Sequence, residues 1–150
     1  MPEPVIICLH QPALELAEKV ASLCDGKVHG LQSRVKTIPE TFEKTKEHLQ
    51  ELFQKGHPLV GICSSGILIR SLADVLSDKH TEPPVLAVAE DGSCVIPLLG
   101  GHQGANDLAR KIASGLGVSA AVTTAGDLKF GIALDQPPED LTLALSLIHI

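Results

Sequence analysis

The sequence is poor in aromatic residues, and this limits both its core and its ligands. Aromatic residues make up 2% of the 150 residues, with three Phe and no Trp or Tyr. The core must therefore be built from Val, Ile, Leu and Ala. Nucleic acid is not expected as a partner, because the net charge is −6 and no stripe of Lys and Arg is present.

Signals for metal sites, disulfides and membrane spans are absent as well. The four cysteines form no C-x-x-C pair and the seven histidines show no H-x-x-x-H spacing, so we expect free thiols and no metal site. No apolar run approaches the roughly 20 residues that cross a bilayer. Residues 1–4 lack a basic and apolar leader. These absences predict a cytoplasmic protein without a membrane partner.

The remaining composition is that of one globular domain, with 44% hydrophobic and 20% charged residues. Short apolar runs predict strands, at residues 5–9, 27–31, 59–63, 85–89, 94–99 and 120–124. Apolar residues at helical spacing predict helices, at residues 12–23, 39–55, 65–76 and 105–116.

The order of these elements predicts an α/β fold. The helix at 39–55 is expected to start at a capping box in Thr37–Glu40 and to stop at Gly56. Glu90–Ser93 is a hairpin signal, so the strands on either side of it should be antiparallel. We therefore predict a three-layer α/β/α sandwich whose sheet is mostly parallel with one antiparallel hairpin.

The turn after the predicted strand at 59–63 has the composition of an anion-binding site. Ligands of such sheets bind beyond the carboxyl ends of strands, where helix N-termini present N–H groups. Ser64 and Ser65 can cap a helix, Gly66 permits close approach to the backbone, and Arg70 adds a cation. These four residues are candidate substrate-binding residues, and the alternative is a plain helix cap. Ser64 is not expected to be a nucleophile, because Ile62 replaces the first Gly of G-x-S-x-G.

The turn after the strand at 94–99 is the second candidate. Gly100, Gly101 and Gly104 fall within five positions and indicate unusual backbone angles or close approach by a ligand. His102 is a candidate acid or base because its side chain exchanges a proton near neutral pH. Asn106 can orient a carboxylate. The alternative is a structural turn with an exposed histidine.

Three further residues, Thr123, Thr124 and Asp127, close the last predicted strand and are candidates to supplement the substrate site. We expect both turns and these residues to meet at one edge of the sheet. Nucleoside triphosphates and dinucleotides are not expected, since the chain has no G-K-[ST] and no G-x-G-x-x-G after its first strand.

The segments around these turns resemble the N-terminal domain of the CbiG family of cobalamin biosynthesis. The resemblance covers about residues 59–127 and includes a specific Gly-His-x-Gly-Ala-Asn segment; it is carried by Gly66–Arg70, Glu90–Gly92, Val95–Ala109 and Thr123–Asp127. It implies a precorrin or cobalt-precorrin as substrate. Such macrocycles are edged with carboxylates, which suit helix N-termini on an acidic protein.

Two versions of this family are implied by the resemblance. Stand-alone members are cobalt-precorrin-5A hydrolases, which open the ring A lactone and release acetaldehyde. In the other version the domain precedes a precorrin-3B C17-methyltransferase that uses S-adenosylmethionine. Stand-alone members usually read Gly-His-x-Gly-Gly-Ala-Asn, whereas this chain has one Gly fewer before Ala105. Residues 127–138 also resemble the fused version more than the stand-alone one. We therefore expect the CbiG-like part of a bifunctional methyltransferase.

The hydrolase remains an alternative, as do a docking domain without catalysis and a generic module for small anions. The parent protein is expected to be an enzyme, whether or not this chain is active alone. No cofactor is expected in this chain, since S-adenosylmethionine would belong to the missing domain. We expect residues 1–135 to form the domain and 136–144 to begin a linker. Residues 145–150 resemble a translated sequencing adapter and are expected to be an artefact.

Overall fold

A six-stranded sheet forms the middle layer of the domain in a computed structural model that describes residues 2–124. The strand order is β3-β2-β1-β4-β5-β6, and every neighbouring pair is parallel except β5 and β6. The strands are β1 (Val5–Cys8), β2 (Lys27–Leu31), β3 (Thr41–Phe42), β4 (Leu59–Ile62), β5 (Val85–Val88) and β6 (Val95–Leu99). The predicted sheet with one antiparallel hairpin is confirmed. Asp127, the predicted linker and the adapter-like residues lie outside the described residues.

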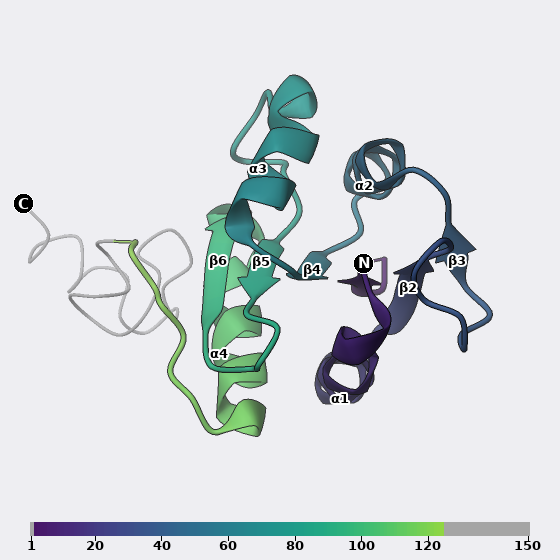
Figure 1. Cartoon of the computed structure of the whole chain (residues 1–150). Helices are drawn as coiled ribbons and strands as arrows, with labels where there is room; N and C mark the ends of the chain where they lie inside the picture. The colour runs from purple at the N-terminus through teal and green to yellow at the C-terminus, as the bar shows by residue number, and fades with distance from the viewer. Residues whose placement is uncertain (1, 125–150) are drawn as a thin grey trace, which may run out of the picture.

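Helices cover both faces of this sheet, as the predicted three-layer sandwich requires (Figure 1). Helices α1 (Leu14–Cys24) and α4 (Ala105–Leu116) lie on one face, and α2 (Thr45–Gln54) and α3 (Ser65–Leu72) lie on the other. Short 3₁₀ turns precede α1 and α4 and follow α3, as η1 (Gln11–Ala13), η3 (Gly101–Gln103) and η2 (Ala73–Val75). Within residues 2–124 no helix is both long and apolar enough to cross a bilayer.

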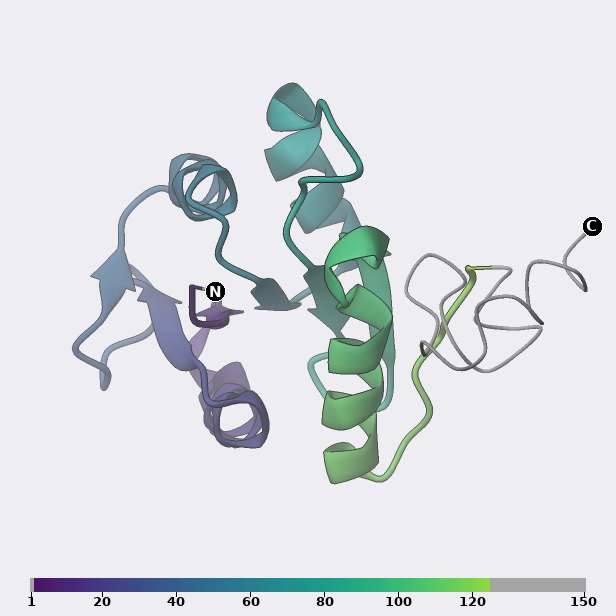
Figure 2. The same ribbon diagram turned by 180° about the vertical axis from the view of Figure 1, so that it is seen from behind.

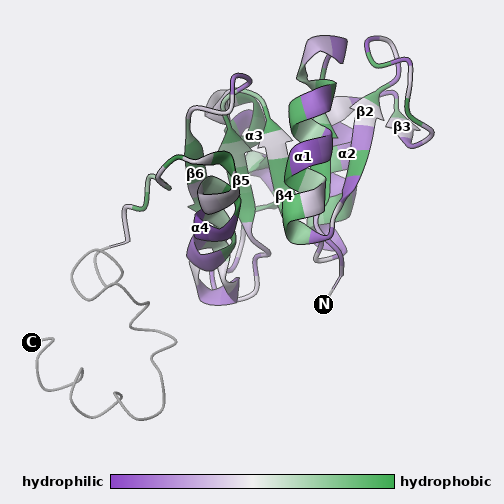
Figure 3. Cartoon of the chain, turned by 90° about the horizontal axis from the view of Figure 1, so that it is seen from below, coloured by the Kyte–Doolittle hydropathy of each residue, from purple (hydrophilic) through white to green (hydrophobic). Residues whose placement is uncertain are grey.

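The continuous apolar strands are explained by burial on both faces. In β1, Ile6 and Cys8 pack with α1 and α4, whereas Val5 and Ile7 pack with α2 and α3. All four are almost completely buried. Successive side chains of a strand point to opposite faces, so a strand covered twice must be apolar throughout. Figure 3 shows the result, with apolar strands inside and polar outer faces on the helices.

The four cysteines are free thiols, as predicted. Cys8, Cys24 and Cys63 are buried among core side chains. Burial raises the pKa of the Cys63 thiol to about 11. These thiols are therefore core-packing groups and poor nucleophiles.

The predicted helix over 39–55 is wrong in its first part. Thr41 and Phe42 instead form β3, which pairs with Gly30 and Leu31 of β2. Two backbone bonds fix this pairing, from Gly30 N–H to the Glu40 carbonyl at 2.9 Å and from Gln32 N–H to the Phe42 carbonyl at 2.8 Å. Helix α2 begins only at Thr45. Strand pairing and burial of the Phe42 ring override the local capping signal.

The predicted last strand, Ala120–Thr124, is also wrong. Only Ala120 bridges to Val95 of β6, and Ala121 N–H donates to the Val95 carbonyl at 2.8 Å. The segment turns back after α4 and runs alongside that helix (Figure 2). At its end, Asn106 Nδ2 donates to Thr124 Oγ1 at 3.2 Å. One backbone bridge to β6 and one side-chain hydrogen bond to Asn106 therefore stand in place of the predicted strand ladder.

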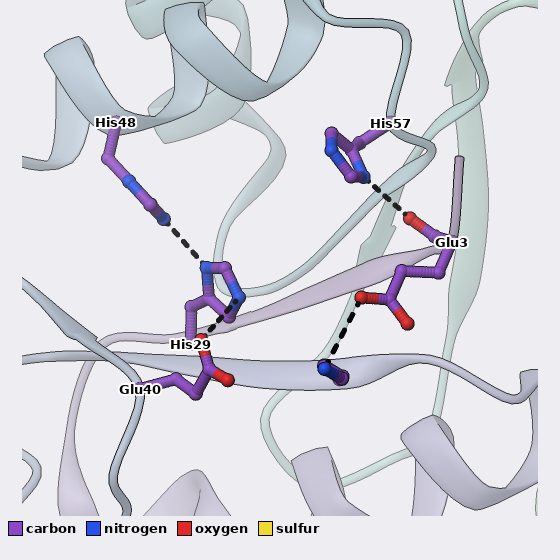
Figure 4. Close-up of polar contacts among 6 residues, drawn as sticks. Glu3, His29, Glu40, His48 and His57 are labelled. Atoms are coloured by element: carbon purple, nitrogen blue, oxygen red, sulfur yellow. Dashed lines mark hydrogen bonds and ion pairs between the residues drawn. The ribbon is translucent and has the colours of Figure 1, made fainter.

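A pair of histidines joins β2 to α2. His29 Nδ1 and His48 Nε2 lie 2.8 Å apart, and the Glu40 carboxylate lies 3.5 Å from His29 Nε2 (Figure 4). The His48 ring also stacks on Phe42, with centroids 4.5 Å apart. Burial lowers the pKa of both histidines below the ordinary value of 6.5. The negative charge of Glu40 partly offsets the lowering of the His29 pKa. The neighbouring His29 lowers the pKa of His48 further.

The lowered pKa of His29 and His48 predicts acid sensitivity of the fold. As the pH falls through 6.5, the unfolded chain takes up protons at these histidines before the folded chain does. The free energy of unfolding should therefore fall with pH below about 7 and be independent of these histidines at pH 8. In His48→Gln, whose amide can still bond to His29, urea denaturation should show a smaller acid-induced loss. An unchanged or larger loss would contradict this account.

The turn between β6 and η3 depends on Gly100. This residue has φ +83, and a Cβ there would lie 2.5 Å from both the Pro83 carbonyl oxygen and the Pro84 Cα. At Gly101 a Cβ would meet no atom within 4 Å. We predict that Gly100→Ala lowers the free energy of unfolding by about 2 kcal/mol or more. Gly101→Ala should change it by less than about 0.5 kcal/mol. Equal effects in urea denaturation would show that Gly100 is not held in this way.

Candidate functional site

The two predicted ligand turns lie at opposite edges of the sheet. Because β6 is antiparallel to β5, it ends where β5 begins, with Leu99 in register with Val85. Gly100 accordingly packs against Pro83 and Pro84, which precede β5. The Ser64 turn instead follows the end of β4. The strands between the two edges, such as β4, have four residues, which corresponds to about 13 Å.

The prediction that both turns meet at one edge is therefore wrong. We call the edge where β1, β2, β4 and β5 end the carboxyl edge, and the edge where they begin the amino edge. Ser64, Ser65, Gly66 and Arg70 belong to the carboxyl edge. His102, Asn106 and Thr124 belong to the amino edge, together with the three glycines of the second turn, Gly100, Gly101 and Gly104.

An open cleft of about 580 Å³ lies at the carboxyl edge. It sits where the strand order reverses, because β1 continues to β2 on one side while β4 lies on the other. This topological switch point is the usual ligand position in open α/β sheets. We call it the switch-point cleft. Its apolar lining consists of Leu9, Leu31 and Ile67, and its cationic lining of Arg34, Lys46 and Arg70.

Arg70 is held over the first turn of its own helix. A Cβ on Gly66 would lie 3.1 Å from Arg70 Nη2 and 3.2 Å from Nη1, so the guanidinium occupies the space that glycine leaves. Side chains of a helix lean toward its N-terminus, which explains why the Arg70 side chain points back toward Gly66. A cation is unfavourable there, because a helix N-terminus carries partial positive charge. An anion in the cleft would stabilise both positive groups.

The ionisable side chains of the cleft are not equally available to bind a ligand. His10 Nε2 lies 2.7 Å from Glu90 Oε1, and Lys46 Nζ lies 2.9 Å from Asp74 Oδ2. Arg34 and Arg70 make no ion pair with any carboxylate among residues 2–124. The two arginines are therefore the cations left to meet an anionic ligand.

The serines of the first turn contribute less than predicted to the helix end. Ser64 is the N-cap residue of α3 and is exposed, but its hydroxyl makes no capping hydrogen bond. Its carbonyl accepts from Ile67 N–H at 3.2 Å. Ser64 and Ser65 are separated only by Gly66 from Ile67, which lines the cleft. Their position therefore fits binding at the cleft rim, although the predicted cap is not formed.

At the amino edge, the glycine-rich turn is held mainly by contacts within the chain. The His102 ring packs on His80 with centroids 4.2 Å apart, and Gln103 Nε2 donates to the His80 carbonyl at 2.8 Å. Asn106 is buried and holds Thr124. The amide that was expected to orient a ligand therefore fastens the segment after α4.

Sequence reasoning missed several residues of the cleft. His10, Arg34 and Glu90 were not proposed, although each follows a strand that ends at the carboxyl edge. That position was the available signal, because loops after parallel strands meet at one edge. Among residues 2–124, no group of three or more His, Cys, Asp or Glu side chains is arranged to hold a metal ion.

Comparisons with known proteins agree with the resemblance. The family model described as cobalamin synthesis G N-terminal matches residues 47–127, which is more than half of the chain. A cobalt-precorrin-5A hydrolase of Salmonella typhimurium is 44% identical over 89 residues, covering 59% of this chain and 25% of that protein. One of Priestia megaterium is 39% identical over 88 residues, covering 58% and 24%. The chain thus spans about a quarter of the length of these relatives.

A solved structure shares the fold. The crystal structure described as a cobalamin biosynthesis protein G homologue from Sulfolobus solfataricus aligns with a TM-score of 0.60 at 20% identity. The alignment covers 81% of this chain and 36% of that one. With a family model over more than half of its length, the chain belongs to the CbiG N-terminal family of cobalamin synthesis.

Proposed function

We propose that the chain binds a carboxylate-bearing cobalt-precorrin in the switch-point cleft, as part of a cobalt-precorrin-5A hydrolase. The observation that carries this proposal is a cleft at the strand-order reversal of a CbiG-family domain, lined by two arginines, Arg34 and Arg70, that have no carboxylate partner within the described part of the chain. A guanidinium binds a carboxylate through two parallel N–H···O bonds, which fixes orientation as well as affinity.

The relatives support the hydrolase more than the fused methyltransferase. Both curated relatives carry the hydrolase name. The methyltransferase version remains a second candidate, because the single Gly between His102-Gln103 and Ala105-Asn106 resembles that version. Since the chain spans about a quarter of the hydrolases, completion of the reaction is assigned to the whole protein.

Within this proposal the chain holds and orients the substrate. Arg70, with Ser64 and Ser65 at the rim, would bind a peripheral carboxylate, and Ile67 would contact the macrocycle edge. Cobalt enters as part of the substrate. His102 lies at the opposite edge of the sheet, so it does not serve as acid or base for a ligand in the cleft. Thr123 and Thr124 are likewise left out of this site.

The choice of substrate and the place of binding can be tested together. The 150-residue chain should bind cobalt-precorrin-5A more tightly than metal-free precorrin-3B in an absorbance titration. Arg70→Gln should weaken that binding roughly tenfold or more, because a charged hydrogen bond contributes about 1.5–3 kcal/mol.

Arg110→Gln is the matched control. Arg110 is the sixth residue of α4, as Arg70 is of α3. Its helix begins at the amino edge, so binding should stay within about twofold of the unaltered chain. Tighter binding of precorrin-3B would favour the methyltransferase version. Binding of neither compound, or a loss confined to Arg110→Gln, would overturn the proposal.

A further inference from the structure

Arg34 is held in place by a well-anchored loop between β2 and β3. Arg34 N–H and Val35 N–H both donate to the Leu31 carbonyl, at 2.9 and 2.8 Å. Val35 is 1% exposed, and its side chain fills the space above Gly30, where a Cβ would lie 2.9 Å from Val35 Cβ. The backbone that carries Arg34 is therefore fixed before any ligand binds.

A second anchor ties this loop to η1, the 3₁₀ turn that precedes α1. Gln11 Oε1 accepts from Lys36 N–H at 3.0 Å, and Gln11 Nε2 donates to Thr37 Oγ1 at 3.1 Å. A preorganised cation loses less freedom on binding than one on a mobile loop. Arg34 thus has the structural support of a binding residue, although its side chain is exposed.

Arg34 and Arg70 approach the cleft from different elements. Arg34 comes from the loop after β2, and Arg70 from α3, which follows β4. Strand β1 lies between β2 and β4 in the sheet, so Leu9, which follows β1, adds to the apolar lining. The other ionisable side chains of the cleft already have partners, since His10 lies against Glu90 and Lys46 against Asp74.

We infer that Arg34 and Arg70 form a two-point clamp for two carboxylates of one macrocycle, with the macrocycle edge on the apolar lining between them. The inference rests on the proposed function and specifies the ligand as a polycarboxylate rather than a single small anion. Arg34 lies before the residues 47–127 that match the family model, so the leading part of the chain contributes half of the recognition.

The test uses cobyrinic acid in its dicyano form, a stable corrin whose peripheral groups are free carboxylates, and its neutral methyl ester. Calorimetric titration of the 150-residue chain should show binding of the acid and much weaker binding of the ester. Arg34→Gln should weaken binding of the acid roughly tenfold. The matched control Lys36→Gln removes an exposed cation of the same loop and should change binding by less than about twofold.

Arg34→Lys provides a second variant that keeps the charge but lacks the guanidinium fork, and it should show an intermediate loss. Thermal melts establish that the variants are folded. Unchanged binding in Arg34→Gln, equal losses in Lys36→Gln, or ester bound as tightly as acid would overturn the clamp. If the unaltered chain still bound cobalt-precorrin-5A in an Arg70-dependent manner, the proposed function would stand without the clamp.

Discussion

The antiparallel pairing of β6 with β5 determines which edge of the sheet each glycine-bearing turn occupies. The hairpin is closed by Gly92, which has φ +75, and by Ser93 N–H donating to Asp91 Oδ1 at 3.0 Å. Because the chain reverses there, α4 starts at the amino edge while α3 starts at the carboxyl edge. The carboxyl edge has the strand-order reversal, and its Arg34 and Arg70 make no ion pair with a carboxylate of residues 2–124. The location of the proposed site therefore follows from the direction of one strand.

Much of the fold is predictable from local sequence patterns. The two elements that are predicted wrongly, the helix start near residue 39 and the last strand, have physical explanations. Strands covered on both faces, such as β1 and β4, appear as continuous apolar runs because every side chain is buried. Thr37–Glu40 carries a helix-start signal, but pairing of Thr41 and Phe42 with β2 depends on a neighbour distant in sequence. Ala120–Thr124 has strand composition, yet within residues 2–124 it contributes one bridge to β6 and one side-chain hydrogen bond with Asn106.

The site was only partly predictable, because it too depends on neighbours that are distant in sequence. Arg70 could be proposed because it follows a glycine-bearing helix start, and it lines the cleft. Arg34 has no motif around it, and it joins Arg70 only because β2, β1 and β4 are neighbours in the sheet. The Glu90–Ser93 turn signal predicts the antiparallel hairpin, and this hairpin carries His102 to the amino edge, away from Arg70. Because β6 runs antiparallel to β5, the turn and helix that follow β6 begin at the amino edge rather than the carboxyl edge.

The ligand position can be measured most directly from amide chemical shifts of the ¹⁵N-labelled chain during titration with dicyanocobyrinic acid. The 15.8 kDa chain is small enough for such spectra. The account predicts the largest shifts at residues 9–10, 31–34, 64–70 and 90, which surround the switch-point cleft. Shifts concentrated at residue 80 and residues 101–106, with the cleft unaffected, would place the ligand at the amino edge and contradict the account.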